Sequence, residues 1–255
     1  MNQITIDVKP RGIESAYIVA PFDKGKETLE KAEYRILSSE ENARLRIQEG
    51  AKEYISQSGN WVKECGVYIL DKGARLTKVP LVCENAEEAT KCHRNGKDYY
   101  LNEEQIERVL ADSVELDTKR LPKLDDGTSY IPTSELHNEK ISTYAFGDIA
   151  EEYGRFLRGA GINKMPIWLA GLQDKPFVRQ LWFCRLGVGG RSDLNCDYRN
   201  LHFGNIRVRG VKDSAEGTAK NFTSAETYTI AQIQEALKRR NILGIEQILI
   251  NELKQ

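Results

Sequence analysis

Residues 183–206, FCRLGVGGRSDLNCDYRNLHFGNI, set the strongest limit on the fold, because neither a helix nor a strand accounts for them. Their apolar residues follow neither the 3.6-residue spacing of a helix nor the alternation of a half-buried strand. Strand-like runs flank the segment, FVRQLWF at 177–183 and RVRGV at 207–211. The fold must therefore support a long irregular segment between two strands.

The composition of this segment is also unusual. It contains no Lys, Glu, Gln, Met or Trp, although these types supply 59 of the 255 residues. About five or six were expected, and chance absence has a probability of roughly one in five hundred. A glycine-rich surface loop is one interpretation, and a fixed framework interleaved with free positions is another. The framework residues would be Trp182, Arg185, Leu186, Arg191, Ser192, Leu194, Arg199, Leu201 and Arg207.

The stretch LWFCRLGVGGRSDLNCDYRNLHFGNIRVRGV resembles the variable region of proteins diversified by diversity-generating retroelements. The stretches YAFGDIAEEYGRFLRGAGINKMPIWLAGLQDKPFVRQLWF, LSSEENARLRIQEG and ISQSGNWVKECGVYIL resemble constant parts of the same family. In that family a reverse transcriptase miscopies adenines of a template repeat. Asn codons of the AAY type that are mutated at their first two bases can then encode many residue types. Lys, Glu, Gln, Met and Trp cannot be reached in this way, and these are the five types missing here.

The resemblance implies a C-type-lectin-like fold and a non-enzymatic, ligand-binding function without cofactor or metal. Its ligand is unknown, and a protein is expected. The framework residues would hold the backbone, while the variable residues would lie exposed on one face. Small polar and aromatic residues suit such adaptable binding loops. The implied variable positions are Phe183, Cys184, Gly187, Val188, Gly189, Gly190, Asp193, Asn195, Cys196, Asp197, Tyr198, Asn200, His202, Phe203, Gly204 and Asn205.

The chain as a whole is expected to be α+β. We predict a small α+β region at residues 1–84 and a C-type-lectin-like domain at 85–212, with the variable region at 183–206. A helical extension is predicted at 213–255, through which the chain could form oligomers. Many relatives end near the RVRGV strand, so this extension departs from the family pattern.

Capping boxes predict helices that open at Ser38, Asn102 and Asp148, because each is followed three residues later by Glu or Gln. Another helix is predicted from Asn85 to Cys92. Residues 118–138 contain turn signals and are expected to form a linker or long loop. Further strands are predicted at residues 4–8, 16–19, 67–70 and 76–82 and in the run MPIWLAGL.

Charge and hydropathy exclude several classes of function. The formal net charge is −1, which gives no general reason to bind nucleic acid or an anionic membrane. No apolar run approaches the length of about 18 residues that spans a bilayer. The N-terminus lacks the order of a signal peptide. A cytoplasmic location is the default expectation.

The cysteines leave an enzymatic alternative open. There are five, with no CxxC motif, which argues against a disulfide framework or a zinc finger. The pair Cys92-His93 has no second cluster at ligand spacing. Oxidases of the formylglycine-generating type share the lectin-like fold and work through cysteines, so Cys184 and Cys196 could be catalytic. Depressed thiol pKa values would support that function.

Two further motifs have alternative interpretations. The run Gly187–Ser192 superficially resembles a phosphate-binding loop, but it lacks the Lys of a P-loop and the spacing of a Rossmann turn. Several arginines with interleaved aromatic residues could bind single-stranded nucleic acid in a salt-sensitive way. The alternative is that they hold the protein's own loops. The arginines are Arg185, Arg191, Arg199, Arg207 and Arg209, and the aromatic residues are Phe183, Tyr198 and Phe203.

Overall fold

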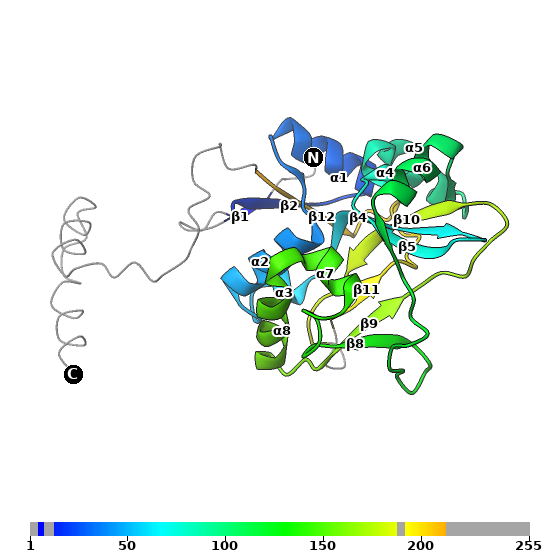
Figure 1. The fold of residues 1–255 in the computed structure, drawn as a ribbon. Helices are drawn as coiled ribbons and strands as arrows, with labels where there is room; N and C mark the ends of the chain where they lie inside the picture. Colours follow the sequence, from blue (N-terminus) through cyan, green and yellow to red (C-terminus); the bar gives the residue numbers. More distant parts are fainter. Residues whose placement is uncertain (1–4, 8–12, 188–191, 213–255) are drawn as a thin grey trace, which may run out of the picture. The chain divides into compact units, whose positions relative to one another are not determined.

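The computed structural model describes residues 5–7, 13–187 and 192–212, and their strands join in one sheet (Figure 1). At its centre β4 (Asn60–Ile69) pairs antiparallel with β10 (Phe177–Phe183). On its other side β4 meets β12 (Arg207–Val211) in parallel. The order along the sheet is β1-β2-β12-β4-β10-β11-β9-β8, where β1 is Thr5–Asp7, β2 Ser15–Val19, β11 Leu194–Asn195, β9 Lys164–Trp168 and β8 Ser129–Pro132.

Four short strands extend this sheet. The strand β3 (Arg35–Ile36) pairs with β12, and β6 (Tyr99–Tyr100) pairs with β10. The strand β5 (Gly73–Thr77) forms a hairpin with β4 and also pairs with β7 (Ser113–Glu115). The strands around β4 therefore come from both halves of the sequence.

The predicted division at residue 84 is wrong, because the first 84 residues supply the centre of the sheet. Strand β4 lies between two strands from the end of the described chain, and β2 pairs with β12 along all five residues of each. The described residues up to 212 all fall within one compact unit, residues 1–214. The predicted helical extension at 213–255 lies outside the described residues.

Helices cover both faces of the sheet (Figure 1). Each group contributes its buried residues to a separate hydrophobic cluster, so the sheet lies between two cores. One group consists of α1 (Phe22–Lys31), α4 (Leu81–Glu84), α5 (Ala86–Arg94) and α6 (Glu103–Ala111). The other consists of α2 (Ser39–Glu49), α3 (Tyr54–Gln57), α7 (Lys140–Phe146), a 3-10 turn (Gly147–Ile149) and α8 (Ala150–Gly159).

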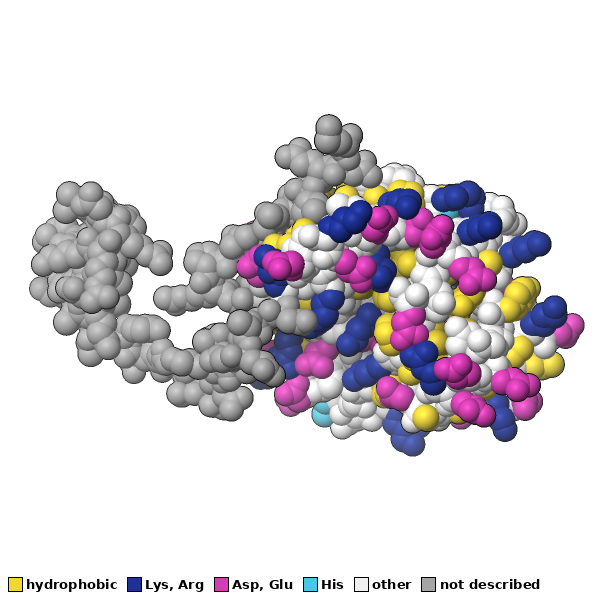
Figure 2. Space-filling model, turned by 90° about the horizontal axis from the view of Figure 1, so that it is seen from above, with side chains coloured by type: hydrophobic (Ala, Val, Ile, Leu, Met, Phe, Trp, Pro, Cys, Tyr) yellow, Lys and Arg dark blue, Asp and Glu magenta, His cyan; other side chains and the backbone are white. Residues whose placement is uncertain are grey.

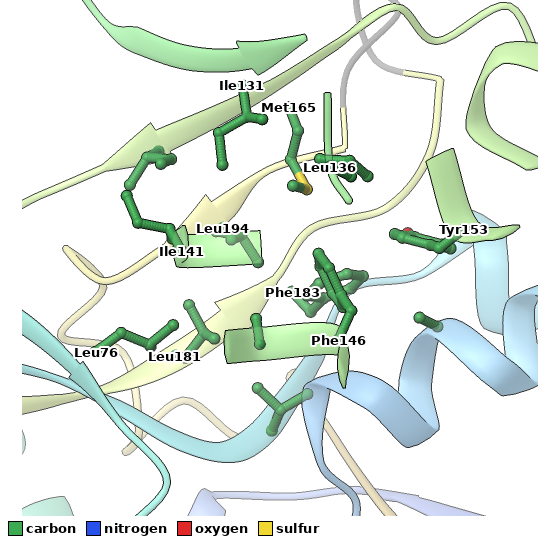
Figure 3. Close-up of a cluster of buried hydrophobic side chains, with 14 of the residues drawn as sticks. Leu76, Ile131, Leu136, Ile141, Phe146, Tyr153, Met165, Leu181, Phe183 and Leu194 are labelled. Atoms are coloured by element: carbon green, nitrogen blue, oxygen red, sulfur yellow. The ribbon is translucent and has the colours of Figure 1, made fainter. Parts of the chain in front are cut away.

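The alternation along β10 shows how one strand serves both cores. Leu181 and Phe183 belong to the cluster on the α7 and α8 face, whereas Val178 belongs to the cluster on the α1 face. A strand covered on both faces has apolar residues at most positions, which explains the run FVRQLWF. Phe183 lies beside Phe146 with ring centroids 5.8 Å apart (Figure 3).

Most of the predicted elements are confirmed. The capping boxes at Ser38 and Asn102 are present, and FVRQLWF and RVRGV form β10 and β12 with the expected bounds. The capping box at Asp148 is wrong, because residues 147–149 form a 3-10 turn and α8 begins at Ala150 without a side-chain cap.

Two other element predictions need correction. The strand predicted at 76–82 ends at Thr77, and Val82 lies in α4. The predicted loop at 118–138 contains β8, which pairs with β9 at the sheet edge. Of the two prolines that suggested a loop, Pro132 is the last residue of β8, which is compatible with an edge strand, where one side of the backbone needs no ladder partner.

Candidate binding surface

A buried arginine from α2 anchors the first part of the segment 183–206. Arg46 Nη2 donates to the backbone oxygen of Cys184 at 2.6 Å, and Nη1 donates to Tyr153 Oη at 3.1 Å and to Ser192 Oγ at 3.3 Å. Its guanidinium lies over the Phe183 ring, 4.5 Å from the centroid. Arg46 is fully buried, so it joins β10, α8 and the segment from inside the protein.

Two side chains of the central strands hold the middle of the segment. Tyr68 Oη donates to the backbone oxygen of Cys196 at 2.8 Å, and Arg179 Nη1 donates to that of Asp197 at 2.7 Å. Arg179 Nε is itself fixed by Asp98 Oδ1 at 2.9 Å. Burial alone would raise the pKa of Asp98, but the hydrogen bonds from Arg179 and Gln173 hold it below its usual value.

Backbone hydrogen bonds fix the end of the segment. The N–H of Phe22, at the start of α1, donates to the oxygen of Leu201 at 2.7 Å. The N–H of Ala20 donates to the oxygen of Ile206 at 3.1 Å. The first N–H groups of a helix have no partner within the helix, so Leu201 satisfies one of them. The contacts with backbone oxygens along the segment do not depend on which side chain occupies the accepting position.

Two of the predicted variable positions are buried, and for them the prediction of an exposed side chain is wrong. Phe183 is 0% exposed and lies within the core of Figure 3. Cys196 is 1% exposed and packs against β4: a Cβ atom added to Gly66 would lie 2.5 Å from Cys196 Cβ. Because the strands place these side chains inside, neither can contact a ligand.

The other described variable positions lie at or near the surface. Asp193 accepts a hydrogen bond from Trp168 Nε1 at 3.0 Å, so β9 orients its carboxylate. Val188, Gly189 and Gly190 lie outside the described residues. The exposed positions are Gly187, Asp197, Tyr198, Phe203, Gly204 and Asn205, and the half-buried ones are Cys184, Asp193, Asn195, Asn200 and His202.

Burial supports the predicted framework role for the apolar residues, for Ser192 and for Arg207, but not for the exposed arginines. Arg185 and Arg199 are exposed, so burial does not support their predicted role of holding the backbone. Arg199 Nη1 donates a long hydrogen bond of 3.4 Å to the backbone oxygen of Gly96. Arg191 lies outside the described residues. Leu186, Ser192, Leu194 and Leu201 are buried, and Trp182 and Arg207 are half-buried.

Several exposed positions meet at a small pocket, which we call the aromatic pocket. Its cavity volume is about 250 Å³. The Trp61 and Trp182 rings meet edge to face with centroids 4.9 Å apart, and the Tyr198 ring lies 6.0 Å from that of Trp182. Trp61 is buried at the base. The pocket is lined by Trp61, Trp182, Tyr198, Phe203, Asn205, Ile206 and Arg207.

Residues of the N-terminal third continue this surface. The Arg207 guanidinium lies 4.7 Å from the ring centroid of Tyr54, and its Nε donates to Tyr54 Oη. The Tyr54 and Tyr17 rings lie 5.0 Å apart. Trp, Tyr and Arg dominate the energetic centres of protein interfaces, so this surface has the composition of a recognition site.

Sequence reasoning did not find the residues outside the segment that complete the surface. Arg46 lies within the stretch LSSEENARLRIQEG, where nothing distinguishes it from Arg44. Trp61 and Tyr68 lie on β4, and only the pairing of β4 with β10 brings them beside the segment. The available signal is the resemblance of LSSEENARLRIQEG and ISQSGNWVKECGVYIL to constant parts of the family.

The thiol environment argues against the oxidase alternative. Burial and the nearby Asp193 carboxylate raise the pKa of Cys184, and burial raises the pKa of Cys196 to about 12. A reactive thiol needs a depressed pKa, so both shifts have the wrong direction. Among the described residues, no cluster of three or more His, Cys, Asp or Glu side chains could hold a metal ion.

The arginines do not form one exposed set, as a nucleic-acid site would need. Arg209 is buried, with Nη1 donating to Ser15 Oγ at 2.9 Å. Of the aromatic members, Phe183 is in the core. Figure 2 shows Lys and Arg interspersed with Asp and Glu over the face in view, in place of a field of one sign. The structure therefore assigns at least Arg209 to holding the protein's own strands.

Comparisons with known proteins give one solved structure and no sequence family. No protein-family model and no curated protein matches the chain. A solved structure from Nanoarchaeota, in work on how the C-type lectin fold accommodates massive sequence variation, matches with a TM-score of 0.55 and 15% identity. The match covers 81% of this chain and 100% of the other.

The likeness shows an α+β chain with a C-type lectin fold, as the sequence resemblance implied. Because the match covers four fifths of the chain, the fold extends beyond the predicted region 85–212 and includes strands of the N-terminal third. Within the described residues, every helix is too short or too polar to cross a bilayer.

Proposed function

We propose that this chain is a non-enzymatic ligand-binding protein whose ligand contacts the surface around the aromatic pocket. The exposed positions of the segment 183–206 would be the variable ones, diversified by retroelement-directed adenine mutagenesis, and the ligand would be a protein. One observation carries the proposal: the backbone of the segment is held by groups from elsewhere in the fold, such as Arg46, Tyr68 and Arg179. Exposed side chains can then change without loss of the fold.

Exchange of exposed positions tests the proposal. We expect the triple variant Tyr198→Ser, Phe203→Ser, Asn205→Ser to melt within about 5 °C of the wild type, because these side chains stand at the surface and a loss of 1 kcal/mol lowers Tm by about 2–4 °C in a chain of this size. Phe183→Ser is the matched control. Loss of a buried aromatic side chain costs about 3–5 kcal/mol, so its Tm should fall by about 10 °C or more. A triple variant as unstable as the control would show that these positions are structural.

The genetic part of the proposal has its own test. The gene for this chain is expected to lie beside a reverse-transcriptase gene and a near-identical copy of the coding stretch for residues 183–206. The two copies should differ only at adenine positions of the second copy. Differences scattered over all four bases would contradict adenine mutagenesis. The triple variant would then be the remaining test of the binding surface.

A further inference from the structure

Among the described residues that line the aromatic pocket, one carries a formal charge, and that charge is positive. It is Arg207, and none of the described lining residues is acidic. The guanidinium is held in place on the Tyr54 ring by a cation–π contact and by the Nε hydrogen bond. Among the described residues, neither Nη atom of Arg207 has a hydrogen-bond or ion-pair partner. A fixed guanidinium with both Nη groups free matches the two oxygens of a carboxylate.

The rest of the pocket is suited to hydrocarbon. Trp182, Tyr198 and Phe203 form its walls, and Phe203 is 43% exposed although it is a large apolar side chain. Asn205 adds an exposed side-chain amide at the rim. The cavity of about 250 Å³ is smaller than the usual range for whole small-molecule ligands, which starts at about 300 Å³. Its size is therefore suited to one side chain of a larger partner.

We infer that the aromatic pocket receives a glutamate side chain of a protein partner, with the carboxylate on the Nη atoms of Arg207 and the methylene groups against Trp182 and Phe203. This inference rests on the proposed function and specifies the chemistry of the ligand. The Trp61 indole N–H at the base donates to no described acceptor, which leaves a second uncompensated donor beside the pocket. Charge complementarity of this kind determines which partner is accepted.

Short peptides test the assignment in the full-length protein. The probes are Ac-Ala-Glu-Ala-NH2, its isosteric neutral match Ac-Ala-Gln-Ala-NH2, Ac-Ala-Lys-Ala-NH2 and inorganic phosphate. Binding is followed by the chemical shift of the Trp182 indole N–H. We expect the Glu peptide to bind at least tenfold more tightly than the Gln peptide, and the Lys peptide to bind more weakly than both.

Variants separate the carboxylate site from a nonspecific contact. Arg207→Gln should reduce the Glu-to-Gln preference to about one, while Phe203→Ala should weaken both peptides by a similar factor. Arg185→Gln, which removes an exposed arginine of the same segment that does not line the pocket, should keep the preference. Arg207→Lys keeps the charge but lacks the two Nη groups, so it should give an intermediate preference. It also tests the inference if the Gln variant does not fold.

Three results would overturn the inference. The first is equal binding of the Glu and Gln peptides, and the second is phosphate binding as tightly as the Glu peptide. The third is no binding of the Glu peptide at a concentration 20-fold above a dissociation constant of about 1 mM, which is the value expected for a single contact. Any of these would leave the proposed function in place, because the exchange experiment reports on the surface without reference to ligand chemistry. If the triple variant is instead as unstable as Phe183→Ser but the protein still prefers the Glu peptide, the pocket binds a carboxylate and its surrounding positions are structural, not variable.

Discussion

At the scale of single residues, Arg46 has the largest structural role in the surface. It is a buried cation that donates to neutral groups: two hydroxyl oxygens and the backbone oxygens of Cys184 and Ser58. Hydrogen bonds to a charged group contribute about 1.5–3 kcal/mol each, and a buried acceptor left without a donor costs about 1–3 kcal/mol. The segment therefore depends on a residue far away in the sequence.

We predict that Arg46→Leu lowers the free energy of unfolding by about 3 kcal/mol, because it leaves the backbone oxygen of Cys184 without its donor and leaves the Tyr153 and Ser192 hydroxyls with only their mutual hydrogen bond. Arg44→Leu on the same helix is the control. Arg44 pairs at the surface with Glu40 at 2.7 Å and with Asp148 at 2.8 Å, and such pairs contribute about 1 kcal/mol or less each. Urea unfolding of both variants measures the difference, and equal losses would contradict the anchoring role.

His93 predicts a dependence of stability on pH. It is buried, neither ring nitrogen has a described partner, and burial lowers the pKa of its imidazole to about 4. The unfolded chain therefore binds a proton below about pH 6.5 that the folded chain refuses until about pH 4. The resulting stability is fully present above pH 6.5 and is lost as the pH falls toward 4.

Comparison with His93→Gln isolates this contribution, because all other titrating groups remain. The unfolding free energy of the wild type relative to the variant should fall by about 2 kcal/mol between pH 7 and pH 5. Urea unfolding at the two pH values measures it. A constant difference would show that His93 is protonated equally in both states, and an NMR titration of its ring would confirm which state is charged.

Only some of the buried residues around the segment could be predicted from the sequence. The buried framework leucines Leu186, Leu194 and Leu201 could be predicted, because apolar residues at fixed places in a polar segment indicate packing. Phe183 and Cys196 could not be separated from exposed neighbours, since the segment has no period that indicates which side chains point inward. The role of Arg46 depends on partners 107 to 146 positions away, and one sequence does not reveal such contacts.

At the scale of elements, continuous or capped patterns were predictable and irregular ones were not. β10 and β12 have the expected bounds because apolar side chains line them, and the helices α2 and α6 begin at true capping boxes. α8 follows α7 through a 3-10 turn at Gly147, whose φ of 60° favours glycine, so its start has no polar cap. β8 has four residues and ends on Pro132, so it is too short for an alternating pattern to be recognised in the sequence.

The candidate surface could be predicted only in part, because its residues come from several elements. Its segment was predictable from composition, but Trp61 arrives on β4 and Tyr54 on α3. β4 brings Trp61 opposite Trp182 on β10 and opposite Val208 on β12. A pocket between these strands therefore exists only when the sheet has formed.

At the scale of the whole molecule, the order of the strands explains why a boundary at residue 84 was a reasonable but wrong prediction. The composition changes there from strand-like to helical and charged, which is typical of a domain junction. The sheet overrides it, because β4 pairs with β10 more than 100 residues later and β2 pairs with β12. Long-range pairing of this kind is invisible to local patterns.

The final prediction tests this architecture with fragments. The fragment 85–214 lacks β2 and β4, so β10 and β12 lose their central partner and both core clusters lose their N-terminal members. We expect it to lack near-UV circular dichroism and a cooperative melting transition. The fragment 1–214, which holds the first compact unit entire, should melt within about 3 °C of the full chain, since a difference of 1 kcal/mol corresponds to about 2–4 °C. Cooperative melting of 85–214 would instead establish an independent domain in the second half, and the aromatic pocket would then have to form without Trp61.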